Sequence, residues 1–219
     1  MLENLTSGFV ELKKEEVLET VKARIGKGDD VLDILDDARR AMTVVGEQFQ
    51  DGTLFLAEMM LSAEIFKGAI NILQPHLEKA RPREPIGTMV LATPRGDIHD
   101  LGKDIFATLL VGQGFEVHNM GVDVEPGLIV EKVKEIKPDF LGFSALITTA
   151  FASMKKTTDL LKQEHLRDSF KLLVGGGVTN STLKDYIGAD FQTIDAMEGV
   201  SYCMDIMVNK NSKANGGPL

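Results

Sequence analysis

The sequence has 219 residues, of which 43% are hydrophobic and 26% charged, a composition typical of globular proteins with a buried core. Its net charge of −9 argues against a nucleic-acid backbone or an anionic membrane surface as the main partner. Cys203 is the only cysteine, which excludes an internal disulfide and a cysteine-rich metal site, and without a secretory or membrane-spanning pattern we expect a cytoplasmic protein.

The first part of the chain has the apolar spacing of amphipathic helices. Hydrophobic residues recur every three or four positions over residues 17–25, 31–49 and 56–77, so each stretch presents one apolar stripe. A short helix before Gly8 would complete a four-helix bundle. We therefore expect a helical domain over residues 1–84.

The composition changes at RPREPI (81–86), where two prolines and alternating charges predict a stiff, exposed connection between domains. Short apolar runs then alternate with helical stretches, which predicts a doubly wound, Rossmann- or flavodoxin-like α/β domain over residues 85–210 with five parallel strands. The polar, glycine-rich segment 211–219 is expected to be a disordered tail. The expected strands are 87–93, 115–120, 140–144, 171–174 and 191–194, and the expected helices are 102–113, 126–137, 150–164, 179–187 and 196–208.

Three unusual segments directly follow expected strands. They are PRGDIHDLGK (94–103) after the first strand, SALITT (144–149) after the third and GGG (175–177) after the fourth. In sheets of this kind ligands bind outside the carboxyl ends of the strands, where the strand order reverses. The convergence of the three segments therefore predicts a ligand site at this edge.

Asp97 and His99 are the candidate reactive pair. A carboxylate that accepts the proton of one imidazole nitrogen leaves the lone pair of the other nitrogen free and more basic, as behind many metal-bound histidines. Gly102 removes a side chain where the loop meets the helix, so that something bulky could approach the backbone. A simpler interpretation stays open on these residues alone, in which Asp97 or Asp100 caps the helix and His99 is an ordinary loop residue.

The pattern of the sequence disfavours a conventional zinc or iron site that includes His99. Such a site needs three or four protein ligands, and His76, His118 and His165 lie in unrelated segments. A single histidine suits a metal that a macrocycle already holds, because that metal needs only an axial ligand.

The hydroxyls and glycines of the other two segments have two interpretations. Ser144, Thr148 and Thr149 can contact a ligand, and the glycines at 175–177 let backbone lie against one, but each group taken alone also fits an ordinary turn. Neither the loop after the first expected strand nor the glycine run at 175–177 matches a phosphate-binding motif, so a nucleotide-binding enzyme is disfavoured.

The order Asp97-x-His99-x-x-Gly102, then Ser144-x-Leu146, then Gly175-Gly176, resembles the cobalamin-binding domains of methionine synthase, the carbon-skeleton mutases and the corrinoid methyl-carrier proteins. The resemblance implies that His99 is the lower axial ligand of cobalt and Asp97 its hydrogen-bonded partner. It also implies that the nucleotide tail of cobalamin enters a cleft of the sheet. The cofactor-binding residues that it implies in this domain are Asp97, His99, Gly102, Ser144, Leu146, Thr148, Thr149, Gly175, Gly176 and Gly177.

The helical half resembles one branch of this family. Segment 44–70 is similar to the helical cap of methionine synthase and the methyl carriers, in which a phenylalanine and a leucine cover the methyl face of the corrin. The corresponding residues are Phe49 and Leu56, which taken alone would be read as plain core. Ala150 is a departure, because methionine synthase has there a serine that extends the Asp–His relay; Thr149 or water could substitute.

The resemblance extends from about residue 10 to residue 208 and implies a corrinoid methyl carrier of a methanol, methylamine or aryl methyl ether (O-demethylase) system. The implied cofactor is cobalamin, which in this family alternates between a nucleophilic cobalt(I) form and methylcobalamin. The implied partners are a substrate-specific methyltransferase, a second methyltransferase that uses tetrahydrofolate or coenzyme M, and a reductive activator. Two alternatives stay open, a cobalamin-dependent sensor and a cofactor-free interaction module in which His99 is only structural.

Overall fold

The structure is a computed structural model that describes the backbone of residues 5–77 and 84–215 and the side chains of these segments up to residue 210. The chain forms two compact units, and the main boundary between them falls between Pro85 and Ile86. Residues 78–83, which include half of the expected connection at 81–86, lie outside the described part. Among the described helices, none is long and apolar enough to cross a membrane.

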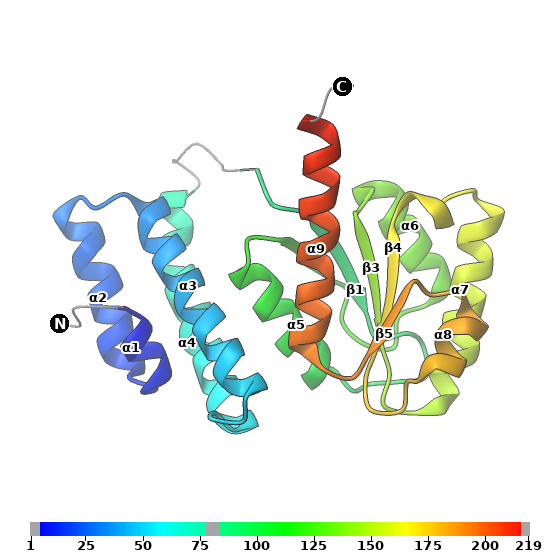
Figure 1. Ribbon diagram of the computed structural model, residues 1–219, viewed down its shortest axis with the longest axis horizontal. Coiled ribbons are helices and arrows are strands. Elements are labelled where there is room, and N and C mark those ends of the chain that lie inside the picture. Colours follow the sequence, from blue (N-terminus) through cyan, green and yellow to red (C-terminus); the bar gives the residue numbers. More distant parts are fainter. Residues whose placement is uncertain (1–4, 78–83, 216–219) are drawn as a thin grey trace. The chain divides into compact units, whose positions relative to one another are not determined.

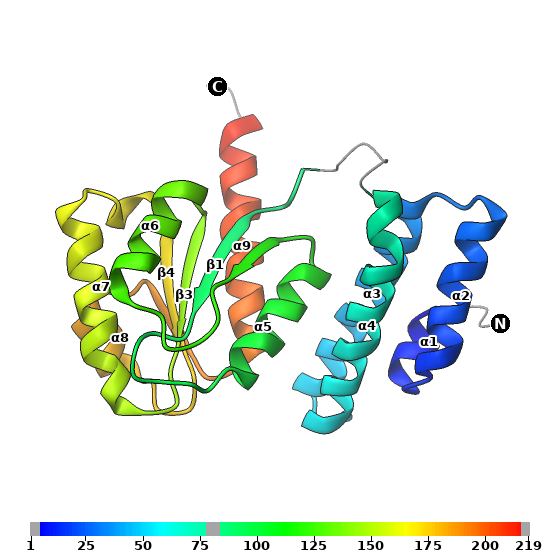
Figure 2. The ribbon, with the colours of Figure 1, turned by 180° about the vertical axis from the view of Figure 1, so that it is seen from behind.

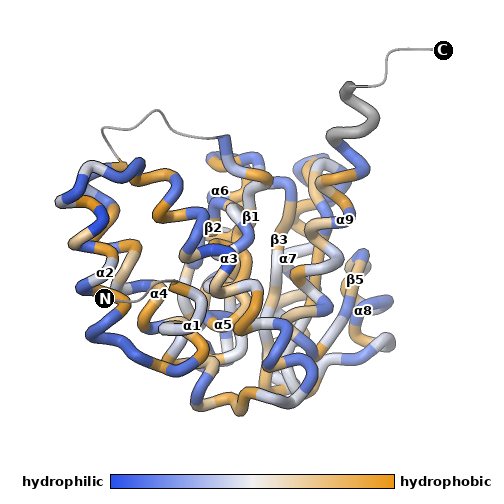
Figure 3. The backbone as a smooth tube through the Cα atoms, turned by 60° about the vertical axis from the view of Figure 1, so that its left-hand side comes forward, coloured by the Kyte–Doolittle hydropathy of each residue, from blue (hydrophilic) through white to orange (hydrophobic). Residues whose placement is uncertain are grey.

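The first unit consists of the four expected helices (Figure 1). They are α1 (Leu5–Val10), α2 (Lys14–Lys27), α3 (Val31–Gln50) and α4 (Leu56–Leu77). The first helix includes Gly8, whereas the sequence analysis expected it to end before that residue. Along these helices the tube in Figure 3 changes repeatedly between orange and blue, as expected when each turn carries both apolar and polar residues.

Local signals in the sequence set the ends of these helices. Gly28 follows α2 with φ +86°, the left-handed conformation that ends many helices, and its N–H donates to the Ile25 carbonyl at 3.0 Å. Asp30 caps α3, because its carboxylate accepts from the Leu32 N–H at 2.9 Å. The apolar stripes meet inside the unit, where Phe9 and Phe66 pack with ring centroids 6.4 Å apart.

The second unit is an α/β domain with one all-parallel, five-stranded sheet (Figures 1 and 2). The order of the strands is β2-β1-β3-β4-β5, so the chain reverses its direction across the sheet at β1. The strands are β1 (Thr88–Ala92), β2 (Glu116–Asn119), β3 (Phe140–Ser144), β4 (Lys171–Gly175) and β5 (Phe191–Thr193). The helices are α5 (Leu101–Gly112), α6 (Pro126–Ile136), α7 (Phe151–Gln163), α8 (Ser181–Ile187) and α9 (Ala196–Asn215).

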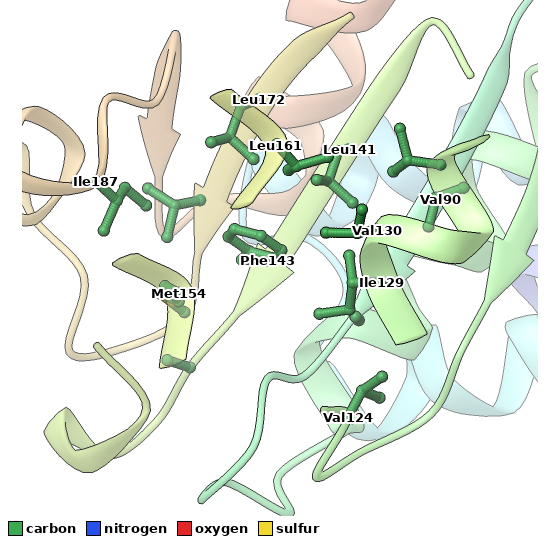
Figure 4. Close-up of a cluster of buried hydrophobic side chains, with 14 of the residues drawn as sticks. Val90, Val124, Ile129, Val130, Leu141, Phe143, Met154, Leu161, Leu172 and Ile187 are labelled. Atoms are coloured by element: carbon green, nitrogen blue, oxygen red, sulfur yellow. The ribbon is translucent and has the colours of Figure 1, made fainter. Parts of the chain in front are cut away.

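Both faces of the sheet are covered by helices. A cluster of buried side chains fills the space between the sheet and helices α6, α7 and α8 (Figure 4), and it includes Val90, Ile129, Leu141, Phe143, Met154, Leu161, Leu172 and Ile187. Burying each of these side chains contributes about 1.5–3 kcal/mol, which makes the sheet a firm base for its loops. On the other face α5 and α9 pack closely, and a Cβ atom added at Gly199 would lie 3.0 Å from the Phe106 ring.

The five strands and five helices expected from the sequence are confirmed, with small shifts of their ends. The largest difference is at α9, which continues to Asn215 and so includes part of the segment 211–219 that was expected to be disordered. Residues 216–219 lie outside the described part. Because all strands are parallel, the loops after β1, β3 and β4 leave the same edge of the sheet, as the sequence analysis required.

Candidate functional site

The loop after β1 and the loop after β3 are joined by the side chain of Asp97. This carboxylate is fully buried. One of its oxygens accepts the His99 N–H at 2.9 Å and the His99 ring Nδ1 lies 2.7 Å from the same oxygen. The other oxygen accepts the N–H groups of Leu146 and Ile147, at 2.6 and 3.2 Å. Asp97 therefore fixes the histidine loop to the neighbouring loop.

These contacts keep the carboxylate ionised. Burial alone would raise the pKa of Asp97, but hydrogen bonds from the His99 N–H, the Leu146 N–H and the His99 ring outweigh it, so that its pKa lies below the usual value. An ionised carboxylate can only accept hydrogen bonds. The contact with Nδ1 therefore places the ring proton on Nδ1. Asp97 is not a simple helix cap, because its carboxylate binds His99 and the loop after β3 and not an N–H group of α5.

His99 presents its second ring nitrogen to the surroundings. Its side chain is 48% exposed, and within the described segments Nε2 has no hydrogen-bond partner. The backbone is also held, because the Thr93 hydroxyl donates to the His99 carbonyl at 3.0 Å. The ring is thus held on its Nδ1 side by Asp97, and its Nε2 side is left for another partner.

Several exposed side chains beside the Asp97–His99 pair are apolar. Ile98 is 72% exposed, and Leu101, Leu146 and Ile147 are exposed as well. Two neighbouring segments that expose four aliphatic side chains and one imidazole suit a broad, largely apolar ligand with a metal. The sequence analysis named Leu146 but missed the other three, although apolar residues inside an otherwise polar loop motif could have indicated them.

Gly102 adds space at the same surface. A Cβ atom at this position would meet no other atom within 4 Å, so the first turn of α5 is open beside the histidine loop. The residues therefore fit a macrocyclic metal cofactor. A conventional metal site does not compete, because no group of three or more metal-binding side chains occurs in the described residues.

The glycines after β4 have a structural reason of their own. Gly176 has φ +105°, and its Cβ atom would lie 2.1 Å from the Ala145 carbonyl oxygen, so only glycine fits there. Cβ atoms at Gly175 and Gly177 would lie 3.2 Å from the Thr193 carbonyl oxygen and 3.1 Å from Leu146 Cδ1. Gly176 and Gly177 thus let the loops after β3 and β4 approach each other, and the tight-turn interpretation holds for Gly176.

The three predicted hydroxyl residues have different surroundings. Ser144 ends β3 and is partly buried, Thr148 is exposed, and neither hydroxyl has a hydrogen-bond partner in the described part of the chain. The Thr149 hydroxyl donates to the Gly96 carbonyl at 3.4 Å. It therefore does not reach Asp97 to replace the serine missing at Ala150, which is buried; backbone N–H groups occupy the far carboxylate oxygen instead.

Phe49 and Leu56 belong to the helical unit and are described within it. Phe49 lies at the end of α3 and is partly buried, whereas Leu56 begins α4 and is 45% exposed. Leu56 is therefore not ordinary core. Phe55, Met60 and Leu61 are exposed beside it in the sequence, so this end of the unit presents an apolar surface that the sequence analysis only partly identified.

Comparison with known proteins identifies both units. Models described as "B12 binding domain" match residues 1–74 and residues 87–201. Dimethylamine corrinoid protein 2 of Methanosarcina acetivorans is 35% identical over 214 residues, which are 96% of this chain and 97% of the relative. Trimethylamine corrinoid protein 2 of the same organism is 38% identical over 195 residues, 88% of this chain and 90% of the relative.

Solved structures agree with these relatives. A cobalamin-binding protein from Desulfitobacterium hafniense is 35% identical, with a TM-score of 0.71 over 92% of this chain and 96% of that chain. The methanol:cobalamin methyltransferase complex MtaBC from Methanosarcina barkeri contains a chain that is 26% identical, with a TM-score of 0.83 over 93% of this chain and 78% of that chain. The resemblance found in the sequence motifs is thereby confirmed, and this chain belongs to the family of corrinoid proteins that join a helical and a Rossmann-like B12-binding domain.

Proposed function

We propose that this protein carries a methyl group between two methyltransferases on the cobalt of a bound cobalamin. The observation that carries the proposal is the Asp97–His99 pair, whose half-exposed ring has exposed aliphatic side chains in its own and the neighbouring loop. Family membership and the names of the relatives, which are corrinoid proteins of methylamine systems, support it. When bound, the corrinoid supplies the cobalt that accepts and releases the methyl group.

His99 would hold the cobalt from below. Asp97 keeps a ring proton on Nδ1, so that Nε2 is the nitrogen that faces a metal, and the ring cannot rotate away without losing a hydrogen bond. The loop is rigid because Asp97 is also bound to the N–H groups of Leu146 and Ile147. The protein therefore provides a ligand that is oriented before the cofactor arrives.

The neighbouring residues would bind the rest of the cofactor. Ile98 and Leu101, which are exposed, would offer apolar contact to the corrin ring and help to exclude water. Ser144 and Thr148 offer hydroxyls to the polar tail, and the absence of a side chain at Gly102 leaves room beside the loop. In the helical unit, Phe49 and Leu56 would shield the upper face of the corrin.

The proposal includes three partners. A substrate-specific methyltransferase delivers the methyl group, a second methyltransferase passes it to tetrahydrofolate or coenzyme M, and a reductive activator restores the cobalt after accidental oxidation. Dimethylamine and trimethylamine appear in the names of close relatives, and this favours a methylamine over methanol or an aryl methyl ether as the donor.

A labelling experiment tests the carrier role. The reduced, cobalamin-loaded protein is incubated with a methylamine methyltransferase and dimethylamine that carries a ¹⁴C-methyl group. We expect label to elute with the protein in a light-sensitive form and then to move to an acceptor when a second methyltransferase is added. Failure of the protein to take up label from methylamines, methanol and aryl methyl ethers, each with its own methyltransferase, would contradict the proposal.

A further inference from the structure

Asp123 lies in the loop between β2 and α6 with an uncommon backbone conformation. Its φ angle is +52°, in the left-handed region that residues other than glycine rarely adopt. Its side chain is exposed, so packing of the side chain into the core does not explain this backbone conformation. Such a conformation persists where the surrounding contacts require it.

The contacts of Asp123 are with the loop that carries His99. The Asp123 N–H donates to the Asp97 carbonyl at 2.9 Å, and a carboxylate oxygen of Asp123 accepts the Gly96 N–H at 2.8 Å. Gly96 is itself left-handed, with φ +94°. Asp123 thus holds the peptide group before Gly96 and the peptide group after Asp97. The Gly96–Asp97 segment, from which the Asp97 side chain starts, is therefore held at both ends.

The remainder of the Asp123 loop is well supported. Thr93 exchanges backbone hydrogen bonds with this loop, donating to the Gly121 carbonyl and accepting from the Val124 N–H, each at 3.0 Å. The Gly121 N–H in turn donates to the side-chain oxygen of Asn119 at 3.0 Å. The buried ammonium of Lys103, in the first turn of α5, donates to the same oxygen at 2.6 Å. The loop therefore forms a fixed support beside the histidine loop.

We propose that Asp123 is a positioning residue for the cobalt ligand, acting through Asp97. One Asp97 carboxylate must reach His99 on one side and two N–H groups of the β3–α7 loop on the other, and this geometry depends on the backbone at residues 96 and 97. The Asp123 carboxylate fixes that backbone. The inference rests on the proposed role of His99 in binding cobalt, but the contact that it concerns exists without the cofactor.

Two substitutions isolate the carboxylate of Asp123. Asp123→Gly adopts the left-handed conformation without strain but has no acceptor for the Gly96 N–H. Asp123→Asn keeps an acceptor oxygen and also tolerates this conformation. Both keep the backbone N–H that donates to Asp97. A difference between them therefore reports the side-chain hydrogen bond.

The first measurement is amide hydrogen exchange in the cofactor-free protein. In Asp123→Gly we expect the N–H groups of His99 and Leu146, both bound to Asp97, to exchange about fivefold faster than in the wild type. Asp123→Asn should stay close to the wild type. The Leu172 N–H, which donates to Asp190 elsewhere in the unit, serves as the control and should not change. Equal exchange in all three proteins, or faster exchange of Leu172 as well, would overturn the inference.

The second measurement uses the visible absorption of bound cobalamin. Asp123→Gly should lower the fraction of cofactor in the histidine-bound form, and Asp123→Asn should restore it. A spectrum of Asp123→Gly that equals the wild-type spectrum would also overturn the inference. The proposed function fails in a different way, because a wild-type spectrum that does not change in His99→Ala would refute the ligand role of His99 while leaving the exchange result untouched.

Discussion

Asp97→Asn is the substitution with the clearest expected outcome, because it changes one oxygen atom in a fully satisfied contact. The carboxylate accepts four hydrogen bonds in the structure, two from His99 and one each from Leu146 and Ile147. An amide has only one acceptor oxygen, and its nitrogen donates. The arrangement with least loss keeps the oxygen toward Leu146 and Ile147 and turns the nitrogen toward His99.

The free-energy cost of Asp97→Asn follows from the contacts that the amide nitrogen makes with His99. The His99 backbone N–H loses its acceptor, which costs about 1–3 kcal/mol, and the remaining bonds lose the strength that the negative charge gave them. The total is about 2–4 kcal/mol, which lowers the melting temperature of a protein of this size by roughly 5–15 °C. The His99 ring must now accept at Nδ1, so its proton moves to Nε2, where it blocks coordination of a metal.

Thermal unfolding and the visible spectrum of bound cobalamin measure these two effects. Asp100→Asn is the matched control, because the Asp100 side chain lies in the same loop, is exposed and has no partner in the described part of the chain. It should change neither property. Our reasoning would be refuted if Asp97→Asn melted at the wild-type temperature and kept the histidine-bound spectrum.

Two further predictions concern stability. Gly176→Ala should lower the free energy of unfolding by about 3 kcal/mol, since its Cβ atom meets the Ala145 carbonyl oxygen. Gly102→Ala should raise the free energy of unfolding by up to about 1 kcal/mol and weaken cobalamin binding. Urea unfolding and titration with cobalamin test both substitutions, and equal effects of the two alanines on unfolding would contradict this reasoning. Asp190→Asn should cost about 1–3 kcal/mol at pH 7. Burial would raise the pKa of Asp190, but the Leu172 N–H and the Arg167 guanidinium lower it below the usual value. The contribution of Asp190 is therefore complete above about pH 4 and is lost as pH falls through this lowered pKa, so the wild type and Asp190→Asn should converge at low pH; a constant difference down to pH 2 would contradict this.

Periodicity and turn residues were sufficient to predict the fold. The apolar spacing over residues 31–49 and 56–77 gave α3 and α4, and the short apolar runs gave all five strands, because both patterns record directly which face is buried. The end of α9 was misjudged, since a polar, glycine-rich composition weakens the apolar signal without preventing helical backbone as far as Asn215.

The site was predictable in its residues but not in its contacts. Asp97 and His99 are close in the sequence, so a local motif sufficed to pair them. Asp123 lies outside every motif that we identified, and its role depends on a left-handed backbone and on the parallel course of two loops. The donors to the second oxygen of Asp97 were also missed. The resemblance suggested Thr149 or water in place of the serine absent at Ala150, whereas the backbone N–H groups of Leu146 and Ile147 are the donors.

The coordination of cobalt by His99 is the central claim, and electron paramagnetic resonance tests it directly. The protein is produced with ¹⁵N-histidine, loaded with unlabelled cobalamin and held in the cobalt(II) state, in which a nitrogen ligand splits each cobalt line. Bonding to a ¹⁵N nucleus gives doublets, and we predict doublets for the wild type and their loss in His99→Ala. Triplets from the unlabelled base of the cofactor, or lines without nitrogen splitting, would contradict the account.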